Sequence, residues 1–263
     1  GVTFIEDLIK FGNALKSQED APPDLFGSEV TVELNQPIPQ DVGKWPTLQK
    51  LSKEKEVVGI YISGHPLDDF KLEANSFGKG SLSLLNQDLS RLLNKELKLS
   101  VIVTEVEHRI SKNGNPFGTL MVEDYNDSFK FFLFGEDYLK NKHFMVDGNF
   151  LFITGKVQPK RFAKTPQDIE FRISNIELLT ELRAKKAKRI NFTFNLDDIS
   201  ENLIDDFHQL LTENEGSCQV KVNVRDHVNR IDVNLSSQLK GVDLSDNFIR
   251  EIEQMDYLEY KVS

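Results

Sequence analysis

The chain has 263 residues, of which 39% are hydrophobic, and carries a formal net charge of −10 at pH 7. Because a typical domain has about 100–150 residues, this length predicts two or three folded units. A single cysteine and five histidines without metal-motif spacing exclude an intrachain disulfide and a cysteine-cluster zinc site. No apolar run reaches the roughly 18 residues that span a bilayer, so we expect a soluble, cytoplasmic protein with no cofactor and no membrane partner.

The negative charge lies mainly outside the middle of the chain. Residues 97–180 contain 11 basic and 11 acidic residues, whereas residues 189–263 contain 7 basic and 15 acidic ones. A neutral segment can still hold a nucleic-acid strand, but the acidic C-terminal segment should repel phosphate. We therefore expect the C-terminal segment to bind a protein.

Residues 1–47 are predicted to form a helix followed by an exposed linker. Thr3 and Glu6 fit a capping box for a helix that begins at Phe4, and residues 17–41 are rich in Pro, Gln, Asp and Glu. The linker contains the adjacent residues Asp24, Leu25 and Phe26. Two large apolar side chains in an extended segment are typical of peptides that dock in a partner's pocket; the alternative is a linker that packs on its own domain. The chain begins with Gly1 rather than methionine, so we expect a fragment of a longer protein.

Residues 48–95 are predicted to be helical, with a hinge. The first helix should end near Tyr61, and the residues of its expected buried stripe are Leu48, Leu51 and Val58. Gly64 permits a left-handed turn and Pro66 can start the next helix, which predicts a hinge between them. No acidic partner accompanies Ser63 and His65 at a recognised spacing, so we expect no catalytic residue. Leucines 82, 84, 85, 89, 92 and 93 predict a short amphipathic helix.

Residues 96–180 contain five segments with the alternation of β-strands. The predicted strands are residues 97–110, 117–123, 129–134, 150–157 and 169–178. The apolar phase shifts after Val103 and again between Ile173 and Ile176, which indicates bulges. A helical segment at about 136–144 falls between the third and fourth strands. This order is typical of a five-stranded OB-fold β-barrel.

Residues 189–263 are predicted to form a small domain after a basic connector at residues 181–188. Its first helix should begin at Asp197 and Asp198 and end at Gly216, and Ser245 should cap its second helix. The order is βαββαβ, that of the split βαβ, or ferredoxin-like, plan. The predicted fold class is therefore α+β: a helical segment, then the OB barrel, then this domain.

The third barrel strand offers a face for nucleic acid. If Lys130 points outward, Phe132 and Phe134 stand beside it, where stacking contributes about 1–3 kcal/mol per base; the alternative is that the two rings pack under neighbouring helical units. Basic residues of the first hairpin and the last loop would contact phosphates. The candidate DNA-binding residues are Arg109, Lys112, Phe117, Lys130, Phe132, Phe134, Lys160, Arg161 and Lys164.

The run from Glu54 to Phe70, with Ser63-Gly64-His65-Pro66-Leu67-Asp68 at its centre, resembles a signature of the bacterial DNA polymerase III alpha subunits. Residues 24–27, 111–118, 134–135 and 153–157 continue the likeness in the same order. The resemblance implies that Asp24, Leu25 and Phe26 bind the sliding clamp (beta subunit), although Pro22 stands where that peptide usually has glutamine. It also implies that the C-terminal domain contacts the clamp-loader tau subunit.

The resemblance further implies that the metal-binding aspartates of the polymerase lie outside this chain. We therefore expect no catalytic residue here and a DNA-directed DNA polymerase as the parent protein. The leading hypothesis is a non-catalytic part that binds single-stranded template DNA, clamp and clamp loader. The alternative is a free-standing OB-fold protein that binds single-stranded nucleic acid. A reading frame extending many hundreds of residues upstream of Gly1 would decide for the polymerase.

Overall fold

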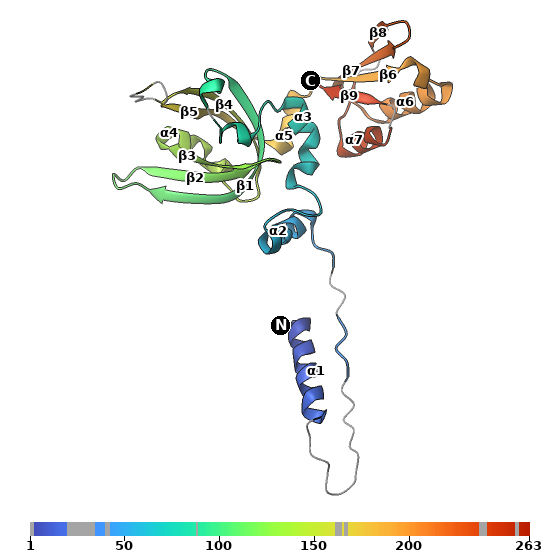
Figure 1. Cartoon of the computed structure of the whole chain (residues 1–263). Helices are drawn as coiled ribbons and strands as arrows, with labels where there is room; N and C mark the ends of the chain where they lie inside the picture. The colour runs from blue at the N-terminus through green and yellow to red at the C-terminus, as the bar shows by residue number, and fades with distance from the viewer. Residues whose placement is uncertain are drawn as a thin grey trace, which may run out of the picture. The chain divides into compact units, whose positions relative to one another are not determined.

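The chain divides into two compact units, Gly1–Ile60 and Tyr61–Ser263, which are described separately. The computed structural model describes residues 3–19, 35–39, 43–87, 89–160, 165, 168–236, 241–255 and 258–263 (Figure 1). Five of the candidate site residues lie outside the described residues: Asp24, Leu25, Phe26, Arg161 and Lys164.

The described residues of the first unit include the helices α1 (Phe4–Glu19) and α2 (Thr47–Val58). The predicted capping box opens α1: the Thr3 backbone N–H donates to Glu6 Oε2 at 2.8 Å, and the Glu6 N–H donates to Thr3 Oγ1 at 3.3 Å. This prediction is confirmed. The reciprocal bonds satisfy two amides that have no partner within the helix.

Helix α2 is shorter than expected, because Gly59 takes a left-handed conformation with φ +86° and ends it. The left-handed residue was expected at Gly64, which has no positive φ. Of the expected buried stripe, Leu51 is 2% exposed, but Leu48 is 38% and Val58 is 55% exposed. The stripe was therefore wrong for two of its three residues.

The second unit begins with the predicted hinge. A 3₁₀ helix, η1 (Pro66–Phe70), starts at the expected proline and runs into α3 (Lys71–Phe77). The leucine-rich stretch is not one amphipathic helix, since it forms two short 3₁₀ helices, η2 (Leu82–Leu84) and η3 (Leu89–Leu92). Hydrogen bonds tie this stretch to the β2–β3 connection: the Leu82 N–H donates to Asp124 Oδ2 at 2.6 Å, and Asn86 Nδ2 donates to the Ser128 carbonyl at 3.1 Å.

A five-stranded antiparallel sheet follows, with the strand order β3-β2-β1-β4-β5. The strands are β1 (Glu96–Ile110), β2 (Pro116–Glu123), β3 (Ser128–Phe134), β4 (Phe150–Pro159) and β5 (Ile169–Leu178). Helix α4 (Gly135–Asn141) and the 3₁₀ helix η4 (Lys142–Phe144) stand between β3 and β4, where the sequence predicted a helix. The first half of β1 pairs with β4 and the second half with β2, and the register shifts between Val103 and Glu105. The bulge expected in β1 is confirmed.

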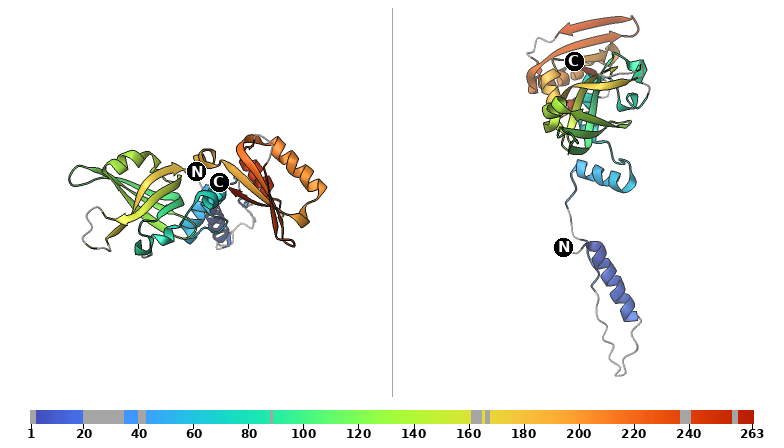
Figure 2. Two further views of the ribbon diagram at one scale, coloured as in Figure 1. Left: turned by 90° about the horizontal axis from the view of Figure 1, so that it is seen from above. Right: turned by 90° about the vertical axis from the view of Figure 1, so that its left-hand side faces the viewer.

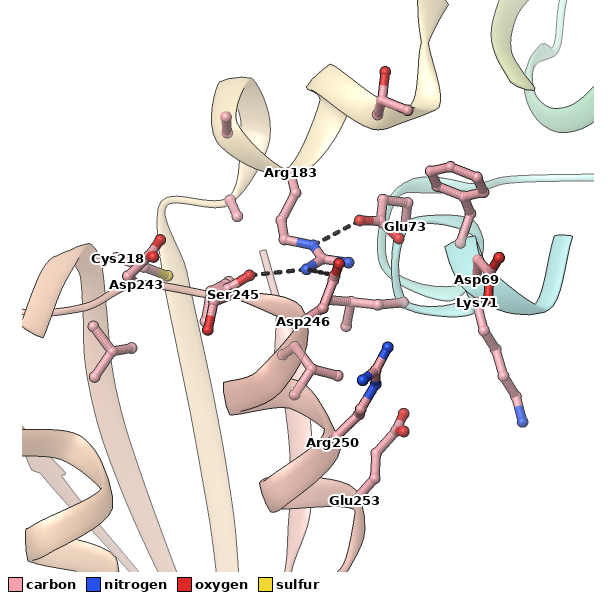
Figure 3. Close-up of a pocket in the computed structure, with 18 of the residues that line it drawn as sticks. Asp69, Lys71, Glu73, Arg183, Cys218, Asp243, Ser245, Asp246, Arg250 and Glu253 are labelled. Atoms are coloured by element: carbon pink, nitrogen blue, oxygen red, sulfur yellow. Dashed lines mark hydrogen bonds and ion pairs between the residues drawn. The ribbon is translucent and has the colours of Figure 1, made fainter. Parts of the chain in front are cut away.

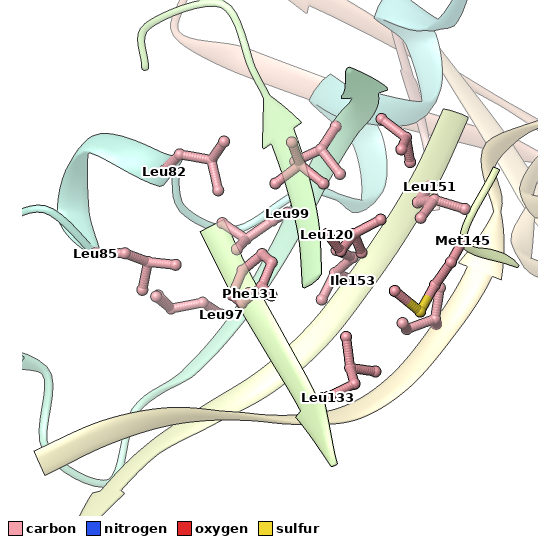
Figure 4. Packing of buried hydrophobic residues seen from close by; sticks show 14 of the residues in the cluster. Leu82, Leu85, Leu97, Leu99, Leu120, Phe131, Leu133, Met145, Leu151 and Ile153 are labelled. Atoms are coloured by element: carbon pink, nitrogen blue, oxygen red, sulfur yellow. The ribbon is translucent and has the colours of Figure 1, made fainter. Parts of the chain in front are cut away.

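The inward side chains of this sheet form one hydrophobic core (Figure 4). Leu99, Leu120 and Ile153 are at most 1% exposed. Phe131 on β3 and Phe171 on β5 have ring centroids 5.8 Å apart, so the two outer strands approach across the interior. Leu82 and Leu85 pack into the same core, which explains why the leucine-rich stretch leads into β1.

Strand β4 is also buried on its other face. Phe152 is fully buried there with Leu67, Leu179 and Leu182. The last two belong to α5 (Leu179–Lys186), a helix over most of the stretch predicted as a connector. The helix was not predicted from the sequence, because the basic composition conceals the two buried leucines that give this connecting segment a packed face.

The C-terminal part forms a four-stranded sheet with the order β8-β7-β6-β9. Its elements are β6 (Arg189–Asn195), η5 (Leu196–Asp198), α6 (Glu201–Glu213), β7 (Glu215–Asp226), β8 (Ile231–Ser236), α7 (Asp246–Glu253) and β9 (Glu259–Val262). In Figure 2, α6 (orange) lies alongside the strands. Apolar residues of α6, α7 and the strands share one core.

The order of elements is βαββαβ as predicted, but the split, ferredoxin-like strand order is wrong. Strands β6 and β7 are parallel neighbours, whereas a split unit would place another strand between them. Here β8 pairs with the free edge of β7, and β9 takes the other edge of β6. The hairpin therefore lies outside the βαβ unit.

Two boundaries of this sheet domain also differ from the predictions. Ser200, rather than Asp197 and Asp198, caps α6, since its Oγ accepts a hydrogen bond from a backbone N–H three residues on. Gly216 lies within β7 and does not close the helix. A Cβ at this glycine would lie 2.3 Å from the Asp243 backbone nitrogen, so the close approach of the two segments requires glycine.

Candidate nucleic-acid interface

Strand β3 presents two different faces. Phe131 and Leu133 are 4% and 3% exposed and point into the core, whereas Phe132 and Phe134 are 58% and 59% exposed. Lys130 lies on the outer side with the two exposed rings, as expected from the alternation. At this exposure the rings are not packed under neighbouring helices, which was the alternative.

The exposed rings continue onto the neighbouring strand. Phe117 on β2 lies directly opposite Phe134, with ring centroids 5.5 Å apart and planes 22° apart. Phe134 and Phe132 are 6.3 Å apart with planes inclined by only 7°. We call these three residues the aromatic row. Near-parallel, exposed rings form a surface on which planar bases can stack.

A charged cluster lies beside the aromatic row. Glu107 on β1 pairs with Thr119 on β2, which in turn lies opposite Phe132 on β3. The Glu107 carboxylate accepts hydrogen bonds from Thr119 Oγ1 at 3.1 Å and from Arg109 Nη2 at 2.9 Å, and Lys130 Nζ is 4.0 Å away. We call Glu107, Arg109, Thr119 and Lys130 the Glu107 cluster.

The electrostatics of the Glu107 cluster keep its carboxylate ionised. The hydrogen bond from Thr119, followed by that from Arg109, holds the pKa of the Glu107 carboxyl below its usual value. Arg109 and Lys130 therefore face a permanent negative charge at neutral pH. The cations that were expected to contact phosphate already have a partner in the folded protein.

The basic residues of the loops are less closely associated with this face. Lys112 is exposed in the β1–β2 hairpin, where the Ser111 N–H donates to the Asn115 carbonyl at 2.9 Å. Lys160 is exposed after β4, and its N–H donates to the Asp168 carbonyl at 2.8 Å. Within the described part of the chain, no hydrogen bond or ion pair joins either lysine side chain to the aromatic row or the Glu107 cluster. The structure thus brings together Arg109, Phe117, Lys130, Phe132 and Phe134.

The hinge around His65 contacts the β2–β3 turn. His65 Nδ1 accepts the Leu67 N–H at 3.1 Å, and its own N–H donates to Asp68 Oδ2 at 2.6 Å. The His65 ring lies 4.5 Å from the Tyr125 ring, whose hydroxyl donates to Asp68 Oδ1 at 3.1 Å. Burial lowers the pKa of His65, although neighbouring carboxylates oppose this effect. These contacts tie His65 and Asp68 to the start of η1 and to Tyr125 in the β2–β3 turn, so the motif fixes the chain where it meets the sheet.

A second polar cluster, missed from the sequence, surrounds Arg183 on α5 (Figure 3). Its guanidinium donates to Glu73 Oε1 at 2.6 Å, to Asp246 Oδ1 at 2.7 Å and to the Leu244 carbonyl at 2.9 Å. These bonds join α3, α5 and the start of α7 beside a pocket of about 970 Å³. Acidic side chains outnumber basic ones in its lining, so the pocket does not suit phosphate. A single arginine in a basic stretch forms no sequence pattern that predicts these hydrogen bonds.

Two features are absent from the described residues. No group of three or more His, Cys, Asp or Glu side chains in them could hold a metal ion. None of their helices is long and apolar enough to cross a membrane.

Comparison with known proteins adds independent information. Residues 190–263 match the model of a family described as DNA polymerase III alpha subunit, C-terminal domain. The DNA polymerase III subunit alpha of Borreliella burgdorferi is 28% identical over 244 residues, which are 89% of this chain and 20% of the relative. That of Bacillus subtilis is 26% identical over 175 residues, which are 66% of this chain and 15% of the relative. The chain spans a fifth or less of the length of these curated relatives.

Among solved structures, the second OB-fold domain of replication protein A from Methanococcus maripaludis is 19% identical. The likeness covers 35% of this chain and 92% of that one, with a TM-score of 0.22. The relatives and the family model confirm the resemblance found in the sequence: this chain resembles the C-terminal region of the DNA polymerase III alpha subunit.

Proposed function

We propose that this chain is the non-catalytic C-terminal part of a replicative DNA polymerase, and that its β1–β5 sheet is an OB barrel that binds single-stranded template DNA. The proposed division of the chain is 1–47, 48–95, 96–180 and 189–263. The aromatic row carries the proposal: three near-parallel rings on one sheet face, two of them more than half exposed. Exposing large aromatic rings to water does not stabilise a folded sheet, whereas stacked bases would remove these rings from water.

Recognition on such a face is independent of sequence. Each base stacked on an aromatic ring contributes about 1–3 kcal/mol, because every base has a π-face. Arg109 and Lys130 stand at either end of the Glu107 cluster, and Lys112 and Lys160 lie in loops that can follow the phosphate backbone. We therefore expect weak binding that falls steeply with salt.

Fluorescence anisotropy with a labelled single-stranded oligonucleotide tests this proposal. Phe132→Ala/Phe134→Ala should weaken binding by at least about ten-fold, because two stacking surfaces are lost. Val228→Ala is the matched control, since it truncates a side chain that is 81% exposed in the C-terminal sheet domain. Equal affinity of the double variant and the control would refute the proposed face. Lys112→Ala/Lys160→Ala should instead reduce the salt dependence.

The linker peptide Asp24-Leu25-Phe26 is proposed to bind the sliding clamp. The resemblance to the polymerase family supports this role, and burial of one leucine or phenylalanine contributes roughly 1.5–3 kcal/mol. Pro22 replaces the glutamine that would add hydrogen bonds, so a dissociation constant near micromolar is expected for the peptide alone. Titration of the clamp into this chain and into Leu25→Ala/Phe26→Ala tests the assignment, which equal affinities would overturn.

The β6–β9 sheet domain is proposed to bind the clamp-loader tau subunit. Its excess of acidic residues favours a protein partner over DNA, and the resemblance to the polymerase family implies the tau subunit as that partner. A pull-down with the tau subunit tests the proposal, and a fall in binding with rising salt is expected. Retention of binding after deletion of residues 189–263 would place the contact elsewhere.

A further inference from the structure

We infer that Glu107 limits the affinity of the proposed DNA-binding face by occupying the cations that would otherwise contact phosphate. This inference rests on the proposed single-stranded DNA binding, and concerns how tightly that same face holds its strand. It assigns Glu107 a role opposite to that of its neighbours Arg109 and Lys130, although all three side chains lie on one sheet face.

The position of Glu107 on the sheet supports this role. The cross-strand row Glu107–Thr119–Phe132 places its carboxylate in the same row as an exposed ring. A strand with a base on Phe132 would therefore carry its backbone close to this row. The Glu107 side chain is 30% exposed, so its charge faces the ligand rather than the core.

The contacts of Glu107 show what phosphate would have to displace. Arg109 Nη2 lies 2.9 Å from Glu107 Oε1, and Lys130 Nζ lies 4.0 Å from Oε2. Thr119 Oγ1 also donates to Oε2, which fixes the carboxylate between the two cations. A phosphate must displace a carboxylate that belongs to the same protein and is already in place. Once bound, the phosphate would still lie close to the negative charge of that carboxylate.

The physical consequence is that the salt dependence comes from the loop lysines rather than from Arg109 and Lys130, which are paired with Glu107. A cationic side chain contributes to the salt dependence only when it binds a phosphate and releases the counterion condensed there. Each such contact on a single strand changes the slope of log K against log salt by about 0.7. Arg109 and Lys130 are paired with Glu107, so their share of this contribution is suppressed. A weak hold of this kind permits the strand to move across the face.

Glu107→Gln tests the inference without removing the side chain's volume or its acceptor for Thr119. We expect a roughly ten-fold gain in affinity for a labelled oligonucleotide at low salt, and a slope of log K against log salt that is steeper by about 0.7–1.4. Glu105→Gln is the matched control: it removes the same charge from the same strand and face. Within the described part of the chain, Glu105 makes no ion pair with Arg109 or Lys130. The expected gain for this control is smaller, with an unchanged slope.

A double variant separates released cations from the change in net charge. Arg109→Gln in the Glu107→Gln background should abolish most of the gain. Equal gains for Glu107→Gln and Glu105→Gln, or a gain that survives Arg109→Gln, would overturn the inference while leaving the proposed function intact. If neither the unaltered chain nor Glu107→Gln binds the oligonucleotide, the proposed function itself fails.

Discussion

Arg183→Met tests which interactions hold α3, α5 and the C-terminal sheet domain together. Arg183 is the partner of Glu73, whose side chain is only 3% exposed. Removal of the arginine leaves a buried carboxylate without a counter-charge, since Glu73 Oε2 is buried and has no hydrogen-bond partner in the described structure. Breaking a buried pair in this way costs about 3–5 kcal/mol of the free energy of unfolding.

The exposed partner of Arg183 should matter much less. The Asp246 side chain is 75% exposed, so water and salt screen its bond to the guanidinium at 2.7 Å. Asp246→Asn is therefore expected to cost about 1 kcal/mol or less. Asp246→Asn removes the charge of the exposed partner and leaves the buried bond to Glu73 in place, so it measures the exposed contact alone.

Thermal and urea denaturation of the whole chain measure both effects. For a unit of this size, a loss of about 3–5 kcal/mol lowers the melting temperature by roughly 6–20 °C. The double variant Arg183→Met/Glu73→Leu should recover most of the stability, because apolar side chains can replace a buried ion pair at little cost. The reasoning would be refuted if Arg183→Met cost no more than Asp246→Asn, or if the double variant were less stable than Arg183→Met alone.

Further substitutions probe three local features. Burial lowers the pKa of His65, so its contribution to stability is complete above about pH 6.5 and is lost as the pH falls from there towards the folded-state pKa. His65→Asn can still cap the helix, and its melting temperature should fall less between pH 7.5 and pH 5.5 than that of the unaltered chain. Equal falls for the two proteins would contradict this. Gly216→Ala should destabilise by about 1–3 kcal/mol in urea, since its Cβ would meet the Asp243 backbone at 2.3 Å, whereas Gly12→Ala, with nothing within 4 Å, should not. Ser245→Ala should cost about 1 kcal/mol through loss of the α7 cap, and Ser245→Asp should restore it; no difference between the two would rule out the cap's contribution.

Features that depend on neighbouring residues could be predicted from the sequence. The bulge in β1 follows from a phase shift in the apolar pattern after Val103, because side chains on a strand alternate with a period of two. The Thr3–Glu6 capping box and the Ser245 cap involve residues three positions apart. In each case the residues that form the feature lie within one helical turn or one strand, so a short stretch of sequence is enough to recognise it.

Features that depend on distant partners could not be predicted in the same way. The alternation of β6 and β7 is compatible with a split or an unsplit sheet, since it records which face is buried but not which strand lies beside it. Helix α5 was missed because only Leu179 and Leu182 are buried in a basic segment, and their partners Leu67 and Phe152 come from elsewhere in the chain. The bond between Arg183 and Glu73 spans 110 positions and leaves no local pattern.

The outer face of β3 lies between these two cases. Alternation alone divides the strand into two apolar faces, one with Phe131 and Leu133 and the other with Phe132 and Phe134. The single charge decides between them, because burying Lys130 without a partner would cost more than exposing two rings. The negative charge of Glu107 can be recognised from the sequence, but its position 4.0 Å from Lys130, two strands away, cannot. Stacking residues can thus be recognised from one strand, whereas the strength of a phosphate contact depends on pairings across the whole sheet.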